Sequence, residues 1–292
     1  MGAASTRQEY DVVLFWSPTT GSCRRRVLSG PLPPTPDSIR PMSDELPSAL
    51  DVAGSDSSAE KRLFKEAARR FSRAGVGPWA FASVKLRIDP VYKEILRQGI
   101  LPRSGRIIDL GCGQALTLSA IRSAQRQYEK RDFPRDWRPP PHDVELYGFD
   151  IREREVSIAR KALSGEAHIE AADLRSVQLP SCSAAVIFDA LHYMEPQDQE
   201  ALLVKIGRAV EIGGTIVLRE ADASGGRGFE AVRWSETLRA TLRGGWRQRF
   251  HYRSAANWAQ RIASLGFETH IQEMGGRTPF KNVLVHGVRR PS

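Results

Sequence analysis

The sequence contains few cysteines and no long apolar run, and each shortage excludes a class of protein. Its 292 residues include 3 cysteines, Cys23, Cys112 and Cys182, with no C-x-x-C pair among them. This spacing argues against a disulfide framework or a metal site and suits a reducing cytoplasm. No apolar run approaches the roughly 18 residues needed to cross a bilayer, so we expect no membrane span.

Lysine is also scarce, because 35 of the 43 basic residues are arginine. The net charge is +9, with 41% hydrophobic and 26% charged residues, as in a soluble globular protein. An arginine bias often reflects a GC-rich genome rather than a function. A uniformly basic surface would indicate nucleic acid or acidic partners, so the position of the charge matters more than its sum.

Residues 1–57 are predicted to be a disordered leader. The stretch 29–58 is dense in Pro, Ser, Gly and Asp and cannot bury enough apolar surface to offset the loss of chain entropy. Met42 could equally be the start of translation. We expect residues 58–104 to form an N-terminal helical lid and residues 105–292 to form the main domain.

From residue 105 onward, apolar strands alternate with amphipathic helices. This alternation predicts an α/β fold with a doubly wound, mostly parallel seven-stranded sheet. The last two strands are joined by GGRTPFK, which is too short for a crossover, so the last strand must be antiparallel. The expected strands are 106–110, 144–150, 167–174, 184–188, 213–222, 268–274 and 282–290, and the expected helices are 60–75, 89–99, 116–127, 153–163, 197–210 and 254–266.

The segment RIIDLGCGQALTLSA, residues 106–120, places two glycines between a strand and a helix. Ligands of open α/β sheets bind beyond the carboxyl ends of the strands, and Gly111 and Gly113 would let the backbone approach one closely. The third glycine of a dinucleotide fingerprint is replaced by Leu116. Asp109 would repel a pyrophosphate and attract a cation. The alternative is a tight turn that binds nothing.

The string DLGCG resembles motif I of the class I SAM-dependent methyltransferases, and the resemblance covers roughly residues 76–290. It implies a Rossmann-like fold and S-adenosyl-L-methionine (SAM) as cofactor. By this resemblance Asp109 contacts the methionine amino group, Asp150 holds the ribose hydroxyls and Asp173 meets the adenine amine. Carboxylates suit all three roles because they accept hydrogen bonds. The other cofactor contacts that the resemblance implies are Gly111, Cys112, Gly113, Ile151, Leu174 and Asp189.

One segment departs from the family pattern. Residues 128–143, YEKRDFPRDWRPPPHD, lengthen the connection so that Asp150 lies 37 residues beyond Gly113. Their proline and charge content predicts a surface insertion. The ribose assignment therefore stays open to another acid.

The string FDALHYM, residues 188–194, would place three side chains beside the methyl group. His192 is the candidate general base, because its unperturbed pKa lies near neutrality. The alternative is that His192 only orders the loop, since methyl transfer can proceed by positioning alone. Tyr193 is expected to be a pocket wall. The NPPY motif of nucleic-acid base methylation is absent.

Two further segments are expected to contact the substrate. Residues 225–261 contain eight arginines and two glutamates, interleaved with aromatic residues. The loop after the sixth strand emerges at the same sheet edge as the glycines; the alternative is a turn that serves only backbone geometry. The substrate contacts predicted in and after this loop are Arg277, Thr278, Phe280 and Asn282.

The leading hypothesis is a cytoplasmic O- or C-methyltransferase acting on a small acidic, aromatic or acyl-carrier-bound metabolite. Short strings such as KLRIDPVY and TPFKNVL are similar to small bacterial methyltransferases of lipid-like or polyene pigment biosynthesis. The alternatives are an RNA or DNA methyltransferase recruited by the arginines, which we disfavour, and a non-catalytic SAM-binding subunit. The sequence determines neither the accepting atom nor the oligomeric state.

Overall fold

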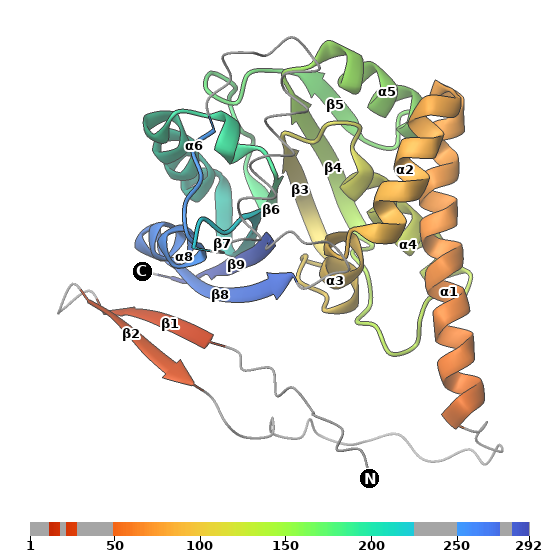
Figure 1. Cartoon of the computed structure of the whole chain (residues 1–292), viewed down its shortest axis with the longest axis horizontal. Coiled ribbons are helices and arrows are strands. Elements are labelled where there is room, and N and C mark those ends of the chain that lie inside the picture. The colour runs from red at the N-terminus through yellow and green to blue at the C-terminus, as the bar shows by residue number, and fades with distance from the viewer. Residues whose placement is uncertain (1–11, 18–21, 28–48, 225–249, 275–281, 292) are drawn as a thin grey trace.

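A mixed sheet runs through the middle of the molecule (Figure 1). The computed structural model describes residues 12–17, 22–27, 49–224, 250–274 and 282–291. Within these ranges the sheet has nine strands in the order β2-β1-β8-β9-β7-β6-β3-β4-β5. The strands are β1 Val12–Ser17, β2 Ser22–Val27, β3 Ser104–Leu110, β4 Asp143–Asp150, β5 His168–Ala171, β6 Cys182–Phe188, β7 Val210–Ala221, β8 Phe267–Met274 and β9 Asn282–Arg289.

The strand directions confirm the predicted α/β topology. Strands β3 to β7 pair in parallel, whereas β9 is antiparallel to both β7 and β8. Because β7 and β8 are both antiparallel to β9, they run in the same direction as each other. The carboxyl ends of β3 to β8 therefore meet at one edge of the sheet, where ligands of open α/β folds bind.

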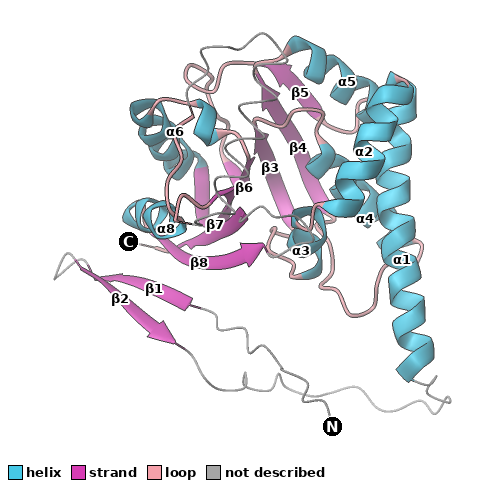
Figure 2. Ribbon diagram, viewed as in Figure 1, coloured by secondary structure: helices cyan, strands magenta, loops and turns pink. Residues whose placement is uncertain are grey.

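Helices cover both faces of the sheet (Figure 2). The N-terminal helices lie with α4 and α5 on one face, and α6 and α8 lie on the other. No helix among the described residues is long and apolar enough to cross a membrane. The helices are α1 Ala49–Arg69, η1 Arg70–Ala74, α2 Val76–Ile88, α3 Val91–Arg97, α4 Leu116–Glu129, α5 Glu153–Leu163, η2 Leu191–Tyr193, α6 Pro196–Ala209 and α8 Ala255–Ser264.

The N-terminal helices, which the sequence analysis expected to act as a lid, pack along the α4 face. The Ser119 hydroxyl on α4 donates to the Ala67 carbonyl of α1 at 2.9 Å, and the buried Arg70 pairs with Glu166 at 2.9 Å. The junction between α2 and α3 reaches the carboxyl edge, because Asp89 pairs with Arg219 of β7. These helices thus contact the site through this junction.

The leader contains more regular structure than predicted. Strands β1 and β2 form an antiparallel hairpin, and β1 extends the sheet by pairing with β8, Val12 opposite Ile271. Helix α1 begins at Ala49, within the range expected to be disordered. The physical reason lies in VVLFWS, whose β-branched and aromatic residues favour a strand, and in the edge of β8, which offers unpaired backbone groups.

The predicted surface insertion is anchored in the core, which corrects the sequence interpretation. Phe133 and Trp137 are buried and pack edge to face, with ring centroids 5.6 Å apart. The Trp137 ring also packs near the Phe64 ring of α1, with the ring centroids 6.4 Å apart. Two aromatic side chains are enough to fix the segment, although most of its other residues are prolines and charged residues.

Candidate cofactor and acceptor site

The loop between β3 and α4 is held against two neighbouring strands. The amides of Gly111 and Cys112 donate to the Phe149 carbonyl of β4 at 2.8 and 3.0 Å. Gly111 has a φ of +73°, and a Cβ there would lie 2.6 Å from the Cβ of Ala190, just after β6. Only glycine therefore fits, and the close approach leaves the loop backbone bare for a ligand.

Asp109, at the end of β3, is a buried carboxyl with little to stabilise its charge. Burial raises its pKa to about 7, and the nearby charge of Asp150 adds to this, while a hydrogen bond with Thr117 opposes it. It forms no ion pair with any residue that the structure describes. A ligand ammonium group would supply the missing positive charge.

Asp150, at the end of β4, is nearly buried and accepts several hydrogen bonds. The Gly113 amide donates to Oδ2 at 2.8 Å, which joins the acid to the glycine loop. Arg152 donates to the same carboxylate from its backbone amide at 2.9 Å and from its guanidinium at 3.0 and 3.1 Å. This hydrogen bonding with Asp150 raises the pKa of Arg152 above its ordinary value. Arg152 thus contacts the carboxylate expected to hold a ribose.

The same arrangement recurs after β5. Arg175 donates to both carboxylate oxygens of Asp173, and these hydrogen bonds hold the pKa of Asp173 below its ordinary value. Asp173 borders a cavity of about 580 Å³ that Tyr147 and Phe149 also line. The structure thus places Asp173 beside a cavity, and its contact with adenine stays a prediction.

The neighbours of these acids differ in exposure. Ile151 is exposed at the carboxyl edge, whereas Leu174 is buried within the apolar core. Cys112 is partly buried, and burial raises the pKa of its thiol well above the ordinary value. Ile151 is therefore open to a ligand, while the side chains of Leu174 and Cys112 serve packing.

His192 lies at the end of β6 in a buried hydrogen-bonded pair. Its Nδ1 is 2.7 Å from Oε2 of Glu220, and the other Glu220 oxygen accepts from the Leu191 amide at 2.8 Å. The Tyr252 ring stacks on the imidazole with the ring centroids 5.0 Å apart. The centroid of the Tyr193 ring lies 4.2 Å from that of the imidazole. Glu220 was missed by the sequence analysis, although an acid within the apolar strand IVLREA was a usable clue.

Asp189 was predicted to contact the cofactor, and the structure places it in an ion-pair network. It adopts a φ of +52° and pairs with the buried Arg219, which also bonds Asp89 at 2.8 Å. Burial raises the pKa of Asp189, while the positive charge of Arg219 opposes the shift. Arg219, which was not among the predicted site residues, pairs with Asp189, whose carboxylate stays partly exposed at the site.

The predicted hairpin contacts are only partly described. Asn282 begins β9 opposite Ala221 of β7 and Met274 of β8, which places it at the carboxyl edge as expected. Arg277, Thr278 and Phe280 lie outside the described residues, as do positions 225–249 of the arginine-rich segment.

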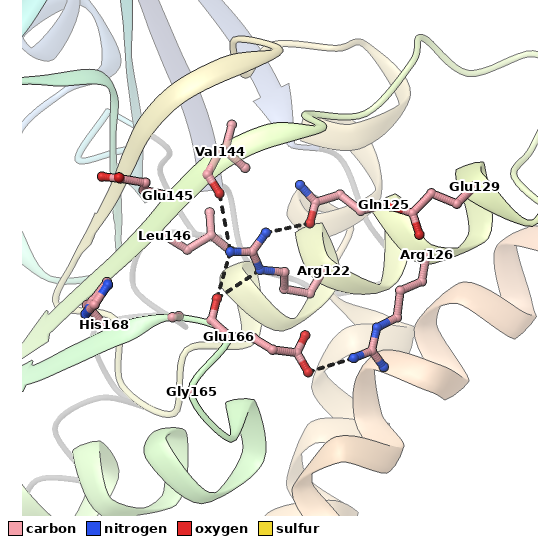
Figure 3. Close-up of a pocket in the computed structure, with 11 residues that line it drawn as sticks. Arg122, Gln125, Arg126, Glu129, Val144, Glu145, Leu146, Gly165, Glu166 and His168 are labelled. Carbon is pink, nitrogen blue, oxygen red and sulfur yellow. Dashed lines mark hydrogen bonds and ion pairs between the residues drawn. The ribbon is translucent and has the colours of Figure 1, made fainter.

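A second cavity, of about 430 Å³, lies among α4, the start of β4 and the start of β5 (Figure 3). Arg122 donates to the carbonyls of Glu166 and Val144 and to the Gln125 side chain. Arg126 pairs with the Glu166 carboxylate at 2.7 Å. The guanidinium groups of Arg122 and Arg126 thus have partners within the protein. The cavity lies at the opposite edge of the sheet from Gly111.

The residues at the carboxyl edge fit SAM. The glycine loop has no side chain at Gly111, so a ligand can lie close to its backbone. The buried Asp109 suits an ammonium group. Asp150 and Asp173 can accept hydrogen bonds from hydroxyl and amine groups. The loop contains no third glycine for a pyrophosphate, so the site favours a cationic nucleoside over a dinucleotide.

Comparisons with known proteins agree with this geometry. A family model described as a methyltransferase domain matches residues 82–273. The carboxy-S-adenosyl-L-methionine synthase of Actinobacillus succinogenes is 26% identical over 132 residues, which cover 43% of this chain and 48% of that protein. The carboxy-S-adenosyl-L-methionine synthase of Mannheimia succiniciproducens is 27% identical over 132 residues, which again cover 43% of this chain and 48% of that protein. The chain thus matches about half the length of these curated relatives.

Solved structures share the fold at low sequence identity. An O-methyltransferase family protein from Burkholderia thailandensis superposes with a TM-score of 0.54 at 17% identity, covering 75% of this chain and 60% of that one. The putative methyltransferase of Haloferax volcanii in complex with Trm112 gives 0.51 at 14% identity, covering 83% and 96%.

Proposed function

We propose that this chain, which belongs to the methyltransferase-domain family, is a SAM-dependent methyltransferase. Its acceptor would be an oxygen or carbon atom of a small acidic, aromatic or acyl-carrier-bound metabolite. We further propose that His192 acts as the general base. The observation that carries the proposal is the buried pair of His192 and Glu220 at the end of β6, enclosed by aromatic rings.

The pair is arranged to hold a proton acceptor in one orientation. Glu220 accepts at Nδ1 of His192, so the neutral imidazole carries its proton there and Nε2 is the ring nitrogen that can take up a proton. A hydroxyl or acidic carbon of the acceptor would lose its proton to Nε2. The Glu220 carboxylate would then stabilise the imidazolium that results.

The other half of the edge would hold the cofactor. SAM, when bound, supplies a methyl group on a positively charged sulfur. Asp109 would accept from the ammonium group, Asp150 from the ribose hydroxyls and Asp173 from the adenine amine. These residues fix the position of the methyl group relative to His192, and such positioning accounts for much of the rate enhancement of a displacement.

The walls around His192 favour an aromatic or apolar acceptor. Tyr193, Phe250 and Tyr252 surround the imidazole, and the Tyr193 and Phe250 rings meet edge to face at 5.5 Å. An aromatic acceptor would pack against such rings. The acidic part of the proposal depends on Arg277 and on arginines at 225–249, which lie outside the described residues.

The described arginines give less support to a nucleic-acid substrate. Eleven of the 26 described arginines pair with carboxylates of the protein itself, so the charge of these eleven is partly neutralised. A nucleic-acid methyltransferase would bind RNA or DNA with an affinity that falls steeply as salt rises. We expect no such binding at low salt.

The test combines an acceptor screen with two histidine variants. A hydroxylated aromatic acid, free or as a carrier-protein thioester, would be incubated with the protein and SAM. Mass spectrometry would then detect the gain of one methyl group. His192→Ala should lower turnover by roughly 10²-fold with unchanged SAM affinity by calorimetry. The control is His270→Ala, whose ring stacks on His286 within β8 and β9. Full turnover of His192→Ala at every pH would show that positioning alone suffices.

A further inference from the structure

Helix α2 presents apolar side chains on two opposite sides. Ala82 and Leu86 are buried against the rest of the protein. The outward side carries large apolar residues that are between 45% and 78% exposed. We call this outward set the α2 stripe: Val76, Trp79, Phe81, Val84 and Ile88.

The concentration of these residues is unusual. They make up half of the ten large apolar side chains that are exposed in the described part of the chain, yet α2 has 13 residues. Isolated exposed apolar residues are normal, whereas a contiguous set marks an interaction surface. A helix of this length presents a stripe about 20 Å long. The α2 stripe is therefore a candidate docking surface.

The α2 stripe ends at the rim of the site. Its last member, Ile88, precedes Asp89, which pairs with Arg219 of β7. Arg219 in turn pairs with Asp189 at the end of β6. Whatever covers the Ile88 end of the stripe therefore lies near the carboxyl edge where the acceptor is expected.

The charged residues of α2 itself have one sign. Lys85 and Arg87 are the charged residues of α2, and the exposed Arg73 precedes it. Lys85 pairs with Asp89 at 2.6 Å, while Arg87 forms no ion pair with any described residue. In a two-fold contact between copies, α2 would meet α2 and bring these cations together. The occupant that complements the stripe is therefore apolar and anionic.

We propose that the α2 stripe docks on the surface of a lipid bilayer that contains acidic headgroups. Val84 and Ile88, which are four residues apart and share one face of α2, would enter the boundary between headgroups and acyl chains. Trp79 and Phe81 would lie at the two margins of that face, and Arg87 would contact the anionic headgroups. The helix would lie on the bilayer without spanning it. This docking does not depend on the acceptor, but it would bring a membrane-dissolved acceptor to the rim of the site.

The test is co-sedimentation of the full-length protein with vesicles. Binding is expected to vesicles of phosphatidylcholine mixed with phosphatidylglycerol, and to be weaker with phosphatidylcholine alone. The triple variant Trp79→Ser, Val84→Ser, Ile88→Ser should bind at least about tenfold more weakly, because each change removes apolar area from the contact. Arg87→Glu should weaken binding to the anionic vesicles alone.

The control carries the same chemical change away from α2. Val204→Ser with Ile212→Ser alters two exposed apolar residues of α6 and β7 and should leave vesicle binding unchanged. All variants should keep the wild-type SAM affinity, and a melting curve of each shows that it is folded. Two results would overturn the proposal. One is an absence of binding to either vesicle; the other is a wild-type dimer in ultracentrifugation that the triple variant converts to a monomer, which would assign the stripe to a second copy.

Discussion

The charged side-chain pairs in the two halves of the carboxyl edge span very different distances along the chain. In the cofactor half, after β4 and β5, each acid bonds an arginine two residues further along the chain: Asp150 with Arg152, and Asp173 with Arg175. The strand end and the first residues beyond it supply both partners of each ion pair, although the Gly113 amide also reaches Asp150 from 37 residues earlier. This half can therefore take its shape as soon as the strands align.

The acceptor half, after β6 and β7, depends on distant partners. His192 bonds Glu220, 28 residues later, and Arg219 bonds Asp89, 130 residues earlier. Both carboxylates are buried, and so is Arg219. The acceptor half thus forms only when α2, β6 and β7 are packed together. Cofactor binding and acceptor chemistry should accordingly respond to different mutations.

The largest expected effect is on the cofactor half, from Gly111→Ala. The added Cβ would lie 2.6 Å from the Cβ of Ala190, so the loop must shift out of the cofactor position. SAM affinity measured by calorimetry should fall by at least about 100-fold, a loss of about 2.7 kcal/mol or more.

The matched control for this change is Gly213→Ala. Gly213 also has a positive φ, of +81°, but a Cβ there meets nothing within 4 Å. The backbone strain of about 1 kcal/mol is shared by the two variants, and only Gly111→Ala adds the clash. Equal SAM affinity in both variants would mean that the glycine loop does not lie under the cofactor.

The difference in contact range also explains what the sequence could predict. The glycine loop and the acids Asp109, Asp150 and Asp173 follow from strand ends and turn residues that are adjacent in the chain. The α8 cap was predictable for the same reason, and Ser254 accepts from the Asn257 amide at 3.2 Å. Local chemistry therefore makes these positions predictable from the sequence.

The acceptor half could not be predicted in this way. Glu220 and Arg219 lie in an apolar strand, and their partners depend on which strands become neighbours and on where the α2–α3 junction packs. The anchoring of the insertion by Phe133 and Trp137 was hidden for the same reason, since their contact with Phe64 is long-range. Composition alone indicated a surface loop.

A second prediction concerns the raised pKa of Asp109. A carboxyl with a pKa of about 7 in the folded state binds its proton more tightly than in the unfolded state, where the pKa is about 4. Its contribution to stability is therefore largest below the unfolded pKa and is lost as the pH rises towards 7. Relative to Asp109→Asn, the wild-type free energy of unfolding should fall by about 3 kcal/mol between roughly pH 5 and pH 8.

Chemical denaturation at the two pH values checks this, and SAM titration gives an independent readout. Because the ionised carboxylate would attract the SAM ammonium, wild-type affinity should rise as the pH passes through neutrality. Asp109→Asn should bind SAM more weakly and with little pH dependence. If the free energies of unfolding of the wild type and of Asp109→Asn changed in parallel with pH, Asp109 would be ionised throughout this pH range.

A third prediction tests the acceptor half through Glu220→Gln. The amide oxygen can still accept from the Leu191 amide, but the amide nitrogen would donate to Nδ1 of His192 and move the imidazole proton to Nε2. Turnover should fall about 10- to 100-fold, while SAM affinity stays at the wild-type value. The pH dependence of turnover should also change, which a purely structural defect would not cause. Loss of SAM binding in this variant would show that the two halves are coupled.

The smallest expected effect separates the two acid–arginine pairs of the cofactor half. Arg152 donates to the carboxylate that the ribose is expected to need, so SAM must displace its guanidinium. The side chain is half exposed, so the ion pair contributes at most about 1 kcal/mol. Arg152→Ala should accordingly raise SAM affinity by up to about fivefold. Arg175→Ala is the matched variant at Asp173, where the acid is more exposed and water already competes, so its effect should be smaller. A fall in affinity for Arg152→Ala would instead mean that the guanidinium contacts the bound cofactor.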